Sequence, residues 1–232
     1  MKRLGSLSIS ATAPAAVVSA IAATSAIFAA SCSLSAAGSG WEYSGGDAPY
    51  EEATSLFAEG DDGRVTFSTN DTTYHSPRGY TVWSVSEGLG GHSGDPFVGV
   101  SGAASKETGD ASAGYGLVFC RGVNGSGDET MYVLLINVKR QFAVGKAVNG
   151  SYVSIRPWTE SPALFAGWGA ENRLRVTRDG AGGRFTVRCN GAAACEFESD
   201  AEVNGSGDAG YVVVISPYDD FPETTVKVVF SP

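Results

Sequence analysis

The sequence predicts an all-β protein, a two-sheet antiparallel β-sandwich or jelly roll that follows a cleaved N-terminal signal. Three observations lead to this fold class. Short runs of β-branched and aromatic residues recur from residue 64 onward, turn pairs such as Asn149-Gly150 separate them, and several runs alternate apolar with polar side chains. Glycine is abundant, at 31 of 232 residues, and only 18% of residues are charged, as expected for strands joined by tight turns.

The predicted strands follow one another at short intervals along the chain. Glycine-containing turn sequences separate several of them, and only the short stretch 51–59 has the composition of a helix. We expect strands at residues 64–68, 80–86, 97–101, 115–121, 131–138, 141–146, 152–156, 173–178, 183–190, 195–198, 211–216 and 225–230.

The pattern within these runs predicts which faces are buried. Apolar residues alternate with arginine or threonine in 173–178 and 183–189, which predicts a sheet packed on one face and in water on the other. Residues 131–138 are nearly all apolar. We therefore expect this segment to be a central strand that is buried on both faces.

The N-terminal segment has the features of an export signal. Met1-Lys2-Arg3 is basic, and no further charged residue occurs before Glu42. The most apolar part, residues 15–30, contains Ser and Thr and is shorter than the roughly 20 residues that span a bilayer. We therefore predict that residues 1–31 are a removed signal rather than a transmembrane helix.

The end of this signal is marked by small residues before a cysteine. Phe28-Ala29-Ala30-Ser31-Cys32 resembles the bacterial lipobox, and Ala29 in place of the usual Leu makes it more similar to spirochaete lipoproteins. The resemblance implies that Cys32 becomes the acylated N-terminus and anchors the protein to a membrane of the cell envelope, at the outer membrane or cell surface. The alternative is ordinary cleavage nearby, for instance after Ala37, which would release a free secreted protein.

Composition and charge limit the remaining organisation. Residues 32–49 are mostly small and polar and are interpreted as a flexible tether, and residues 50–232 are long enough for one β-sandwich domain. The formal net charge is −9, and the signal would remove two more positive charges. Nucleic acid is therefore a poor partner.

Four cysteines in an exported chain raise the question of disulfides. If Cys32 is acylated, one of the remaining three has no partner. Cys189 and Cys195 flank a short loop and are the favoured pair because of their proximity, whereas Cys120 lies in an apolar run and is interpreted as a buried thiol.

One hexapeptide, Val-Asn-Gly-Ser-Gly-Asp, occurs twice, at residues 123–128 and 203–208. Asp128 and Asp208 with neighbouring carbonyls are weak candidates for a calcium site. The favoured interpretation is a pair of hairpin turns, because each loop offers few carboxylates and Asn-Gly is typical of tight turns. No other cofactor is predicted.

Several segments carry a resemblance to a known fold family. They are residues 114–119 (Gly-Tyr-Gly-Leu-Val-Phe), 132–136, 158–162, 171–176, 183–191 and 210–214. Their order from residue 113 to the C-terminus resembles the concanavalin A-like lectin and glucanase sandwich, which includes laminin-G-like domains. The resemblance implies a sandwich fold and, as functions to consider, carbohydrate binding or glycoside hydrolysis.

The sequence offers little support for catalysis. Retaining glucanases of this family carry Glu-x-Asp-x-x-Glu on one strand, because two carboxylates must flank the glycosidic bond, and no strand here has that pattern. His75 and His92 lack partners at metal-ligand spacing, and no Gly-x-Ser-x-Gly motif is present. These absences favour a protein without enzymatic activity.

Aromatic residues near loops are the remaining candidates for ligand contact, because their rings can stack on sugar rings. The candidates are Trp168, Tyr218, Trp158 and Tyr152, and packing into the sandwich is the competing interpretation, favoured for Trp158. The sequence thus predicts an anchored binding module for carbohydrate or for a surface partner. The alternatives are a glycoside hydrolase of the same fold and a purely structural or adhesion protein.

Overall fold

The structure is a computed structural model, and it describes residues 49–86, 89, 96–180, 183–203 and 207–232. The predicted signal, Cys32, the tether up to residue 48 and His92 lie outside the described residues. Within the described part, no helix has the length and apolar character needed to cross a membrane.

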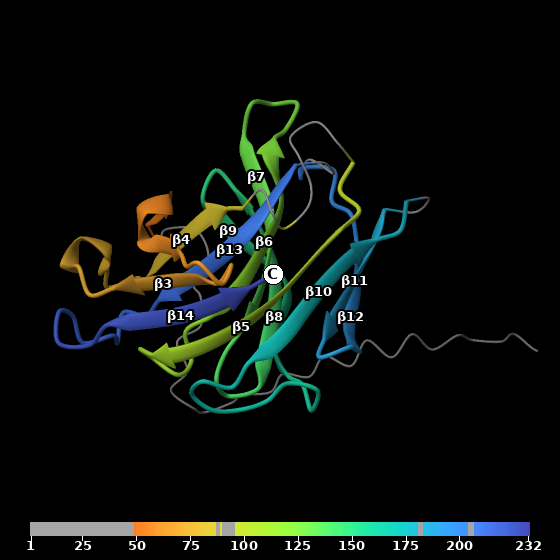
Figure 1. The fold of residues 1–232 in the computed structure, drawn as a ribbon. Helices are drawn as coiled ribbons and strands as arrows, with labels where there is room; N and C mark the ends of the chain where they lie inside the picture. The colour runs from red at the N-terminus through yellow and green to blue at the C-terminus, as the bar shows by residue number, and fades with distance from the viewer. Residues whose placement is uncertain (1–48, 87–88, 90–95, 181–182, 204–206) are drawn as a thin grey trace, which may run out of the picture. The chain divides into compact units, whose positions relative to one another are not determined.

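The described strands form two seven-stranded sheets that pack face to face, which confirms the predicted two-sheet sandwich (Figure 1). Sheet A contains, in spatial order, β1 (Tyr50–Glu52), β4 (Tyr80–Val85), β13 (Asp208–Ile215), β6 (Tyr115–Val123), β7 (Glu129–Ile136), β8 (Gln141–Val148) and β9 (Ser151–Glu160). Sheet B contains β12 (Ala192–Glu198), β11 (Arg184–Cys189), β10 (Asn172–Arg178), β5 (Gly99–Thr108), β14 (Val226–Ser231), β3 (Val65–Thr69) and β2 (Phe57–Glu59). Neighbouring strands are antiparallel except that β1 runs parallel to β4.

Each of the predicted strands is present, with ends that differ by a few residues, and β5 is longer than expected. The stretch 51–59, which has the composition of a helix, does not form one. This stretch holds β1, a single 3-10 turn at Thr54–Leu56 and β2. Nine residues are too few for a stable isolated helix, and here the two short strands instead pair with β4 and β3 at the sheet edges.

The core between the sheets is built on stacked aromatic rings. Phe119 and Tyr132 come from sheet A, Phe185 and Phe197 come from sheet B, and all four are buried. The Phe185 and Phe197 rings stack with centroids 4.8 Å apart, and Tyr132 meets Phe185 at 5.2 Å. Buried rings of this size each contribute roughly 2–3 kcal/mol of hydrophobic stabilisation, so this cluster holds the two sheets together.

The face of sheet A turned away from sheet B, called here the outer face of sheet A, is also apolar. Its buried residues are Trp83, Val118, Met131, Val133, Leu135, Ala147, Val212 and Val214. In β7, Tyr132 and Leu134 face the core while Met131, Val133 and Leu135 lie on this outer face. The prediction that residues 131–138 are buried on both faces is therefore confirmed.

Candidate functional site

The loop between β9 and β10, residues 161–171, presents two large apolar side chains to solvent. Phe165 is 61% exposed and Trp168 is 50% exposed. Exposed aromatic rings on a loop are typical of binding surfaces, because each can bury a large apolar area against a ligand. Among the described regions that hold a predicted ligand-binding residue, this aromatic loop is the one with two exposed aromatic rings.

A buried asparagine holds the aromatic loop in one conformation. The Asn172 Oδ1 atom accepts a hydrogen bond from the Phe165 N–H at 2.7 Å, and its Nδ2 donates to the Phe165 carbonyl at 3.1 Å. Asn190, in the turn between β11 and β12, donates to Asn172 Oδ1 at 2.9 Å and to the Ala163 carbonyl at 2.7 Å. The loop is therefore tied to the start of β10 and to a neighbouring turn.

Backbone bonds on both sides of Trp168 fix the rest of the loop. The N–H of Gly167 donates to the Val138 carbonyl at 2.9 Å, and the N–H of Gly169 donates to the Lys106 carbonyl at 2.8 Å. Gly167 and Gly169 have φ values of +104° and +70°, a region that side chains disfavour. Glycine on each side thus permits the turn that projects Trp168 from the sheet.

The strand that accepts the Gly169 hydrogen bond, β5, is fixed in turn by a buried lysine. Lys106 is fully buried, and its Nζ donates to the carbonyls of Asp110 at 2.8 Å and Ala113 at 3.3 Å. Burial lowers the pKa of Lys106 to about 8, although the nearby Asp219 and Asp110 carboxyls oppose that shift. Asp219, also buried, accepts the N–H groups of Ser216 and Asp110 at 2.7 and 2.6 Å.

Two of the predicted ligand-binding residues lie elsewhere, on the outer face of sheet A. Tyr152 and Trp158 are both in β9 and half-buried. The Tyr152 ring lies over Gly145, where a Cβ atom would be only 2.1 Å from the ring, and the Trp158 ring lies against Gly114. The pocket beside Tyr152 has a volume of about 10 Å³, so it has room for about one water molecule and none for a sugar ring.

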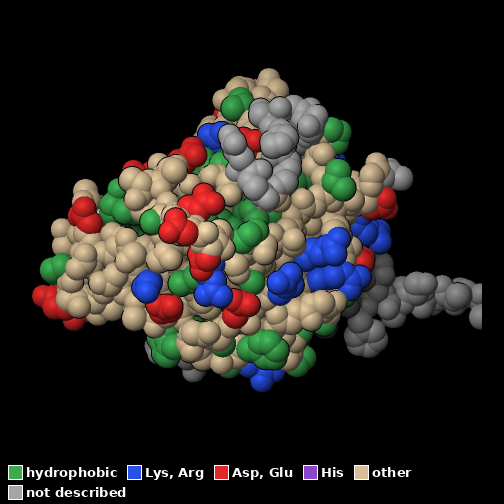
Figure 2. Space-filling model, viewed as in Figure 1, with side chains coloured by type: hydrophobic (Ala, Val, Ile, Leu, Met, Phe, Trp, Pro, Cys, Tyr) green, Lys and Arg blue, Asp and Glu red, His purple; other side chains and the backbone are tan. Residues whose placement is uncertain are grey.

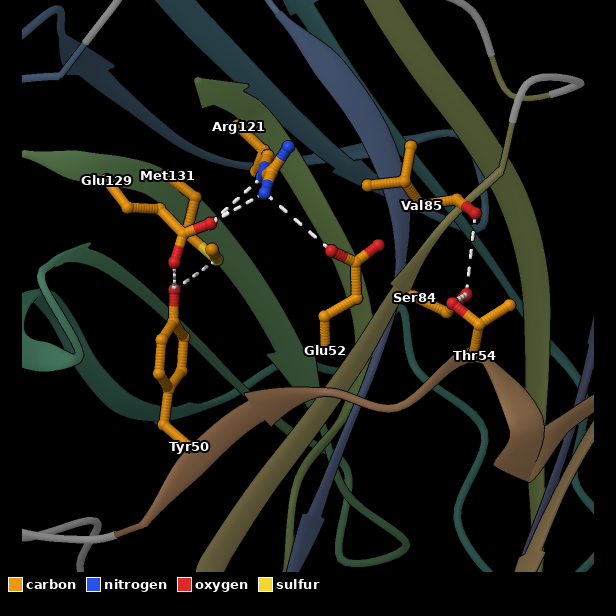
Figure 3. A network of polar contacts seen from close by, with 8 residues as sticks. All are labelled: Tyr50, Glu52, Thr54, Ser84, Val85, Arg121, Glu129 and Met131. Carbon is orange, nitrogen blue, oxygen red and sulfur yellow. Dashed lines mark hydrogen bonds and ion pairs between the residues drawn. The ribbon is translucent and has the colours of Figure 1, made fainter. Parts of the chain in front are cut away.

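A charged network closes one end of this outer face (Figure 3). Arg121 donates from Nε and Nη2 to Glu129 Oε1 at 3.0 and 2.8 Å, and Glu52 Oε2 lies 3.7 Å from Nη2. The Tyr50 hydroxyl donates to the other Glu129 oxygen at 2.8 Å, and the Arg121 guanidinium lies over the Trp83 ring.

The carboxylates of Glu52 and Glu129 are thus near each other, as a glycosidase requires, but the guanidinium of Arg121 occupies the space between them. A hydrolase needs that space for the glycosidic bond, with one carboxyl group able to donate a proton. This arrangement is a structural ion-pair network and lacks the geometry of a catalytic pair.

Tyr218, the fourth predicted ligand-binding residue, is 71% exposed in the loop between β13 and β14. Among the residues that the structure describes, no hydrogen bond or ring contact joins it to Trp168 or to the aromatic residues of sheet A. Tyr152 and Trp158 thus lie on sheet A, whereas Trp168 and Tyr218 lie in two loops that both reach Lys106, since Gly169 donates to its carbonyl and Asp219 lies near its ammonium.

The two calcium candidates lie in a turn, Asp128, and at the start of a strand, Asp208. The Asp128 carboxylate accepts a hydrogen bond from Asn149 Nδ2 at 2.5 Å, and Asp208 begins β13 opposite Arg121. Residues 204–206 of the second hexapeptide lie outside the described residues. In the described ranges, no group of three or more His, Cys, Asp or Glu side chains is placed to hold a metal ion.

The disulfide expected between Cys189 and Cys195 is not formed in the structure, where Cys120, Cys189 and Cys195 are free thiols. Cys195 lies opposite Val187 and Cys189 lies opposite Ala192, so the two cysteines are diagonal neighbours. A register shift between Val187 and Arg188 separates them, and Cys195 is close enough to Cys189 to act on it electrostatically. Burial raises the pKa of Cys120 and of Cys189 to about 12, which keeps both thiols protonated and unreactive at neutral pH.

Among the comparisons with known proteins, those with solved structures give matches. No protein-family model matches the sequence, and no curated protein does. Solved structures do match. A β-glucanase from Bacillus licheniformis is similar with a TM-score of 0.50 at 7% identity, over 84% of this chain and 90% of the glucanase.

Weaker similarities extend to carbohydrate-binding proteins. The carbohydrate-binding module CBM66 from Bacillus subtilis matches with a TM-score of 0.47 at 12% identity, over 75% of this chain and 87% of that module. At such identities the likeness shows the fold alone. The chain has the concanavalin A-like β-sandwich fold that the strand order resembled.

Sequence reasoning missed the residues that build the aromatic loop. Asn172 and Asn190 are 18 residues apart and meet only because β10 and β11 pair in one register. Lys106 was not expected in the core, since the predicted strand ended at residue 101. A lysine within a long run of small residues was the available signal for a buried cation.

Proposed function

We propose that this chain is an exported, membrane-anchored binding module that recognises carbohydrate and does not cleave it. The observation that carries this proposal is the pair of exposed rings, Phe165 and Trp168, on a loop held by buried Asn172. A ligand that stacks on a ring already fixed in place costs little conformational entropy. Indole faces suit sugar rings because one face of a pyranose is largely C–H.

The absence of cleavage is supported by the chemistry of the described carboxylates. One pair of neighbouring carboxylates, Glu52 with Glu129, is bridged by Arg121, and another, Asp200 with Glu202, is bridged by Lys146. The aromatic loop itself contributes one carboxylate, Glu171, and a glycosidase of the common type needs two. A surface protein remains the second class of ligand, because exposed aromatic rings also serve as protein-binding anchors.

A glycan array combined with an assay for new reducing ends tests binding and cleavage together. We expect the full mature protein to bind a restricted set of glycans and to leave each of them intact over hours. New reducing ends would establish a hydrolase instead. No binding to any glycan, with capture of a surface protein from the same cells, would establish an adhesion protein.

The anchor is proposed from the lipobox-like sequence that ends at Cys32. Two or three acyl chains at about 0.8 kcal/mol per buried methylene would hold the protein at a membrane without a protein segment in the bilayer. Mass spectrometry of the protein extracted from membranes is expected to give a chain that begins at Cys32 and carries acyl increments. A chain that begins at residue 38, or an unmodified Cys32, would contradict the anchor.

A further inference from the structure

Three arginines gather on the outer face of sheet B. Arg173 and Arg175 are in β10 and Arg188 is in β11, and all three side chains are exposed. Arg175 lies directly opposite Arg188 in the strand pair, and Arg173 is two residues from Arg175 on the same face. Figure 2 shows Lys and Arg side chains forming a continuous patch over this part of the molecule.

The three residues of this arginine face form no ion pair with a described carboxylate. Arg184, on the same face of β11, forms ion pairs with Glu196 and Glu198, and Lys227 pairs with Glu107. No such pair involves Arg173, Arg175 or Arg188. Apart from the Arg175–Arg188 pair itself, their cross-strand neighbours Ser101, Ala103 and Ala193 are small and uncharged. Arg188 Nη1 donates to the Gly191 carbonyl at 3.2 Å.

Holding these arginines together is unfavourable for the folded protein alone. Like charges directly opposite each other in a strand pair repel and destabilise the sheet. The chain is acidic, with 25 Asp and Glu against 16 Lys and Arg, so carboxylates were available to pair with them. An arrangement that opposes folding in the absence of a ligand is expected where a ligand supplies the missing negative charge.

We infer that the arginine face binds an acidic glycan, a chain bearing carboxylate or sulfate groups. This inference rests on the proposed carbohydrate binding and specifies the class of sugar. Guanidinium groups bind such anions through two parallel N–H···O bonds. Guanidinium-bearing positions about 5 Å apart across the strands and about 7 Å apart along one strand give a slender chain several anchoring points.

The geometry favours a glycan over other polyanions. The aromatic loop runs directly into Arg173, so stacking and charge recognition are adjacent in the chain. The arginines span only a small area with no apolar side chain exposed between them, whereas a stable protein interface needs about 800 Å² per partner.

The test compares charged polymers with their neutral counterparts, using the full mature protein. The probes are polygalacturonate with its methyl ester, and dextran sulfate with dextran. We expect at least one charged polymer to bind tenfold more tightly than its neutral counterpart. Arg188→Gln is expected to weaken that binding at least fivefold. Arg184→Gln is the matched control, with the same strand, face and charge change, and is expected to alter it less than twofold.

Three results would overturn the inference. They are equal binding of both charged polymers and their neutral counterparts, equal effects of Arg188→Gln and Arg184→Gln, and tighter binding of polyglutamate, an oligonucleotide or phosphatidylglycerol vesicles. If neutral and charged polymers bind equally well, this inference fails and the proposed carbohydrate binding stands. If no glycan binds, both the inference and the proposed carbohydrate binding fail. Arg188→Gln is also expected to raise the Tm slightly, because repulsion with Arg175 is removed, so weaker binding would not reflect misfolding.

Discussion

Replacing Asp219 with alanine is expected to lower the free energy of unfolding by about 3–5 kcal/mol. The substitution leaves the N–H groups of Ser216 and Asp110 without an acceptor and removes the carboxylate with the largest electrostatic effect on buried Lys106. Chemical denaturation at pH 7 measures the change. Asp220→Ala is the control, because Asp220 is exposed and its loss is expected to cost less than about 0.5 kcal/mol.

The pH dependence separates the lost charge from the lost hydrogen bonds. The pKa of Lys106 is lowered to about 8 in the folded protein, and removing Asp219 lowers that pKa further, because the carboxylate favours the charged ammonium. Between the new pKa and pH 8, the folded variant binds fewer protons than the folded wild type, while the unfolded chains are alike. Stability of the variant therefore rises more steeply with pH.

The destabilisation by Asp219→Ala is accordingly expected to be smaller at pH 9 than at pH 7. A destabilisation that is the same at both pH values would mean that Lys106 does not interact with Asp219. The hydrogen bonds to Ser216 and Asp110 would then account for the whole effect.

The strands were predictable because their signal is local. Alternation in 173–178 correctly placed Leu174 and Val176 in the core and Arg173 and Arg175 on the exposed face. The edge strands β1 and β2 were not predictable, since three residues carry no period and their conformation depends on pairing with β4 and β3. The sandwich class therefore followed from the sequence, and its edges did not.

The candidate site was predictable only in part, because its geometry depends on register. Trp168 was predicted as a ligand contact because it is an aromatic residue near glycine; the structure places it 50% exposed, and its contact with a ligand stays a prediction. Asn190 donates a hydrogen bond to Asn172, and Arg175 lies opposite Arg188. Both contacts depend on how β10 pairs with β11. A single sequence does not state which residues of two strands lie opposite each other, so these features required the structure.

If the aromatic loop binds the ligand, replacing Trp168 should weaken ligand binding far more than replacing Trp158. Trp168→Ala is expected to weaken binding by about 2 kcal/mol, roughly 30-fold, because an exposed ring on a fixed loop acts as an anchor. The free energy of unfolding is expected to change little. Trp158→Ala is the matched control, since its half-buried ring packs against Gly114 on sheet A and its loss mainly affects stability.

The most direct measurement is therefore calorimetric titration of the wild type and both tryptophan variants with the glycan that binds best on the array. The result expected is a roughly 30-fold weaker affinity for Trp168→Ala and an affinity within twofold of wild type for Trp158→Ala. The opposite pattern, with binding lost in a folded Trp158→Ala protein and kept in Trp168→Ala, would place the ligand on the outer face of sheet A and contradict the aromatic loop as the binding site.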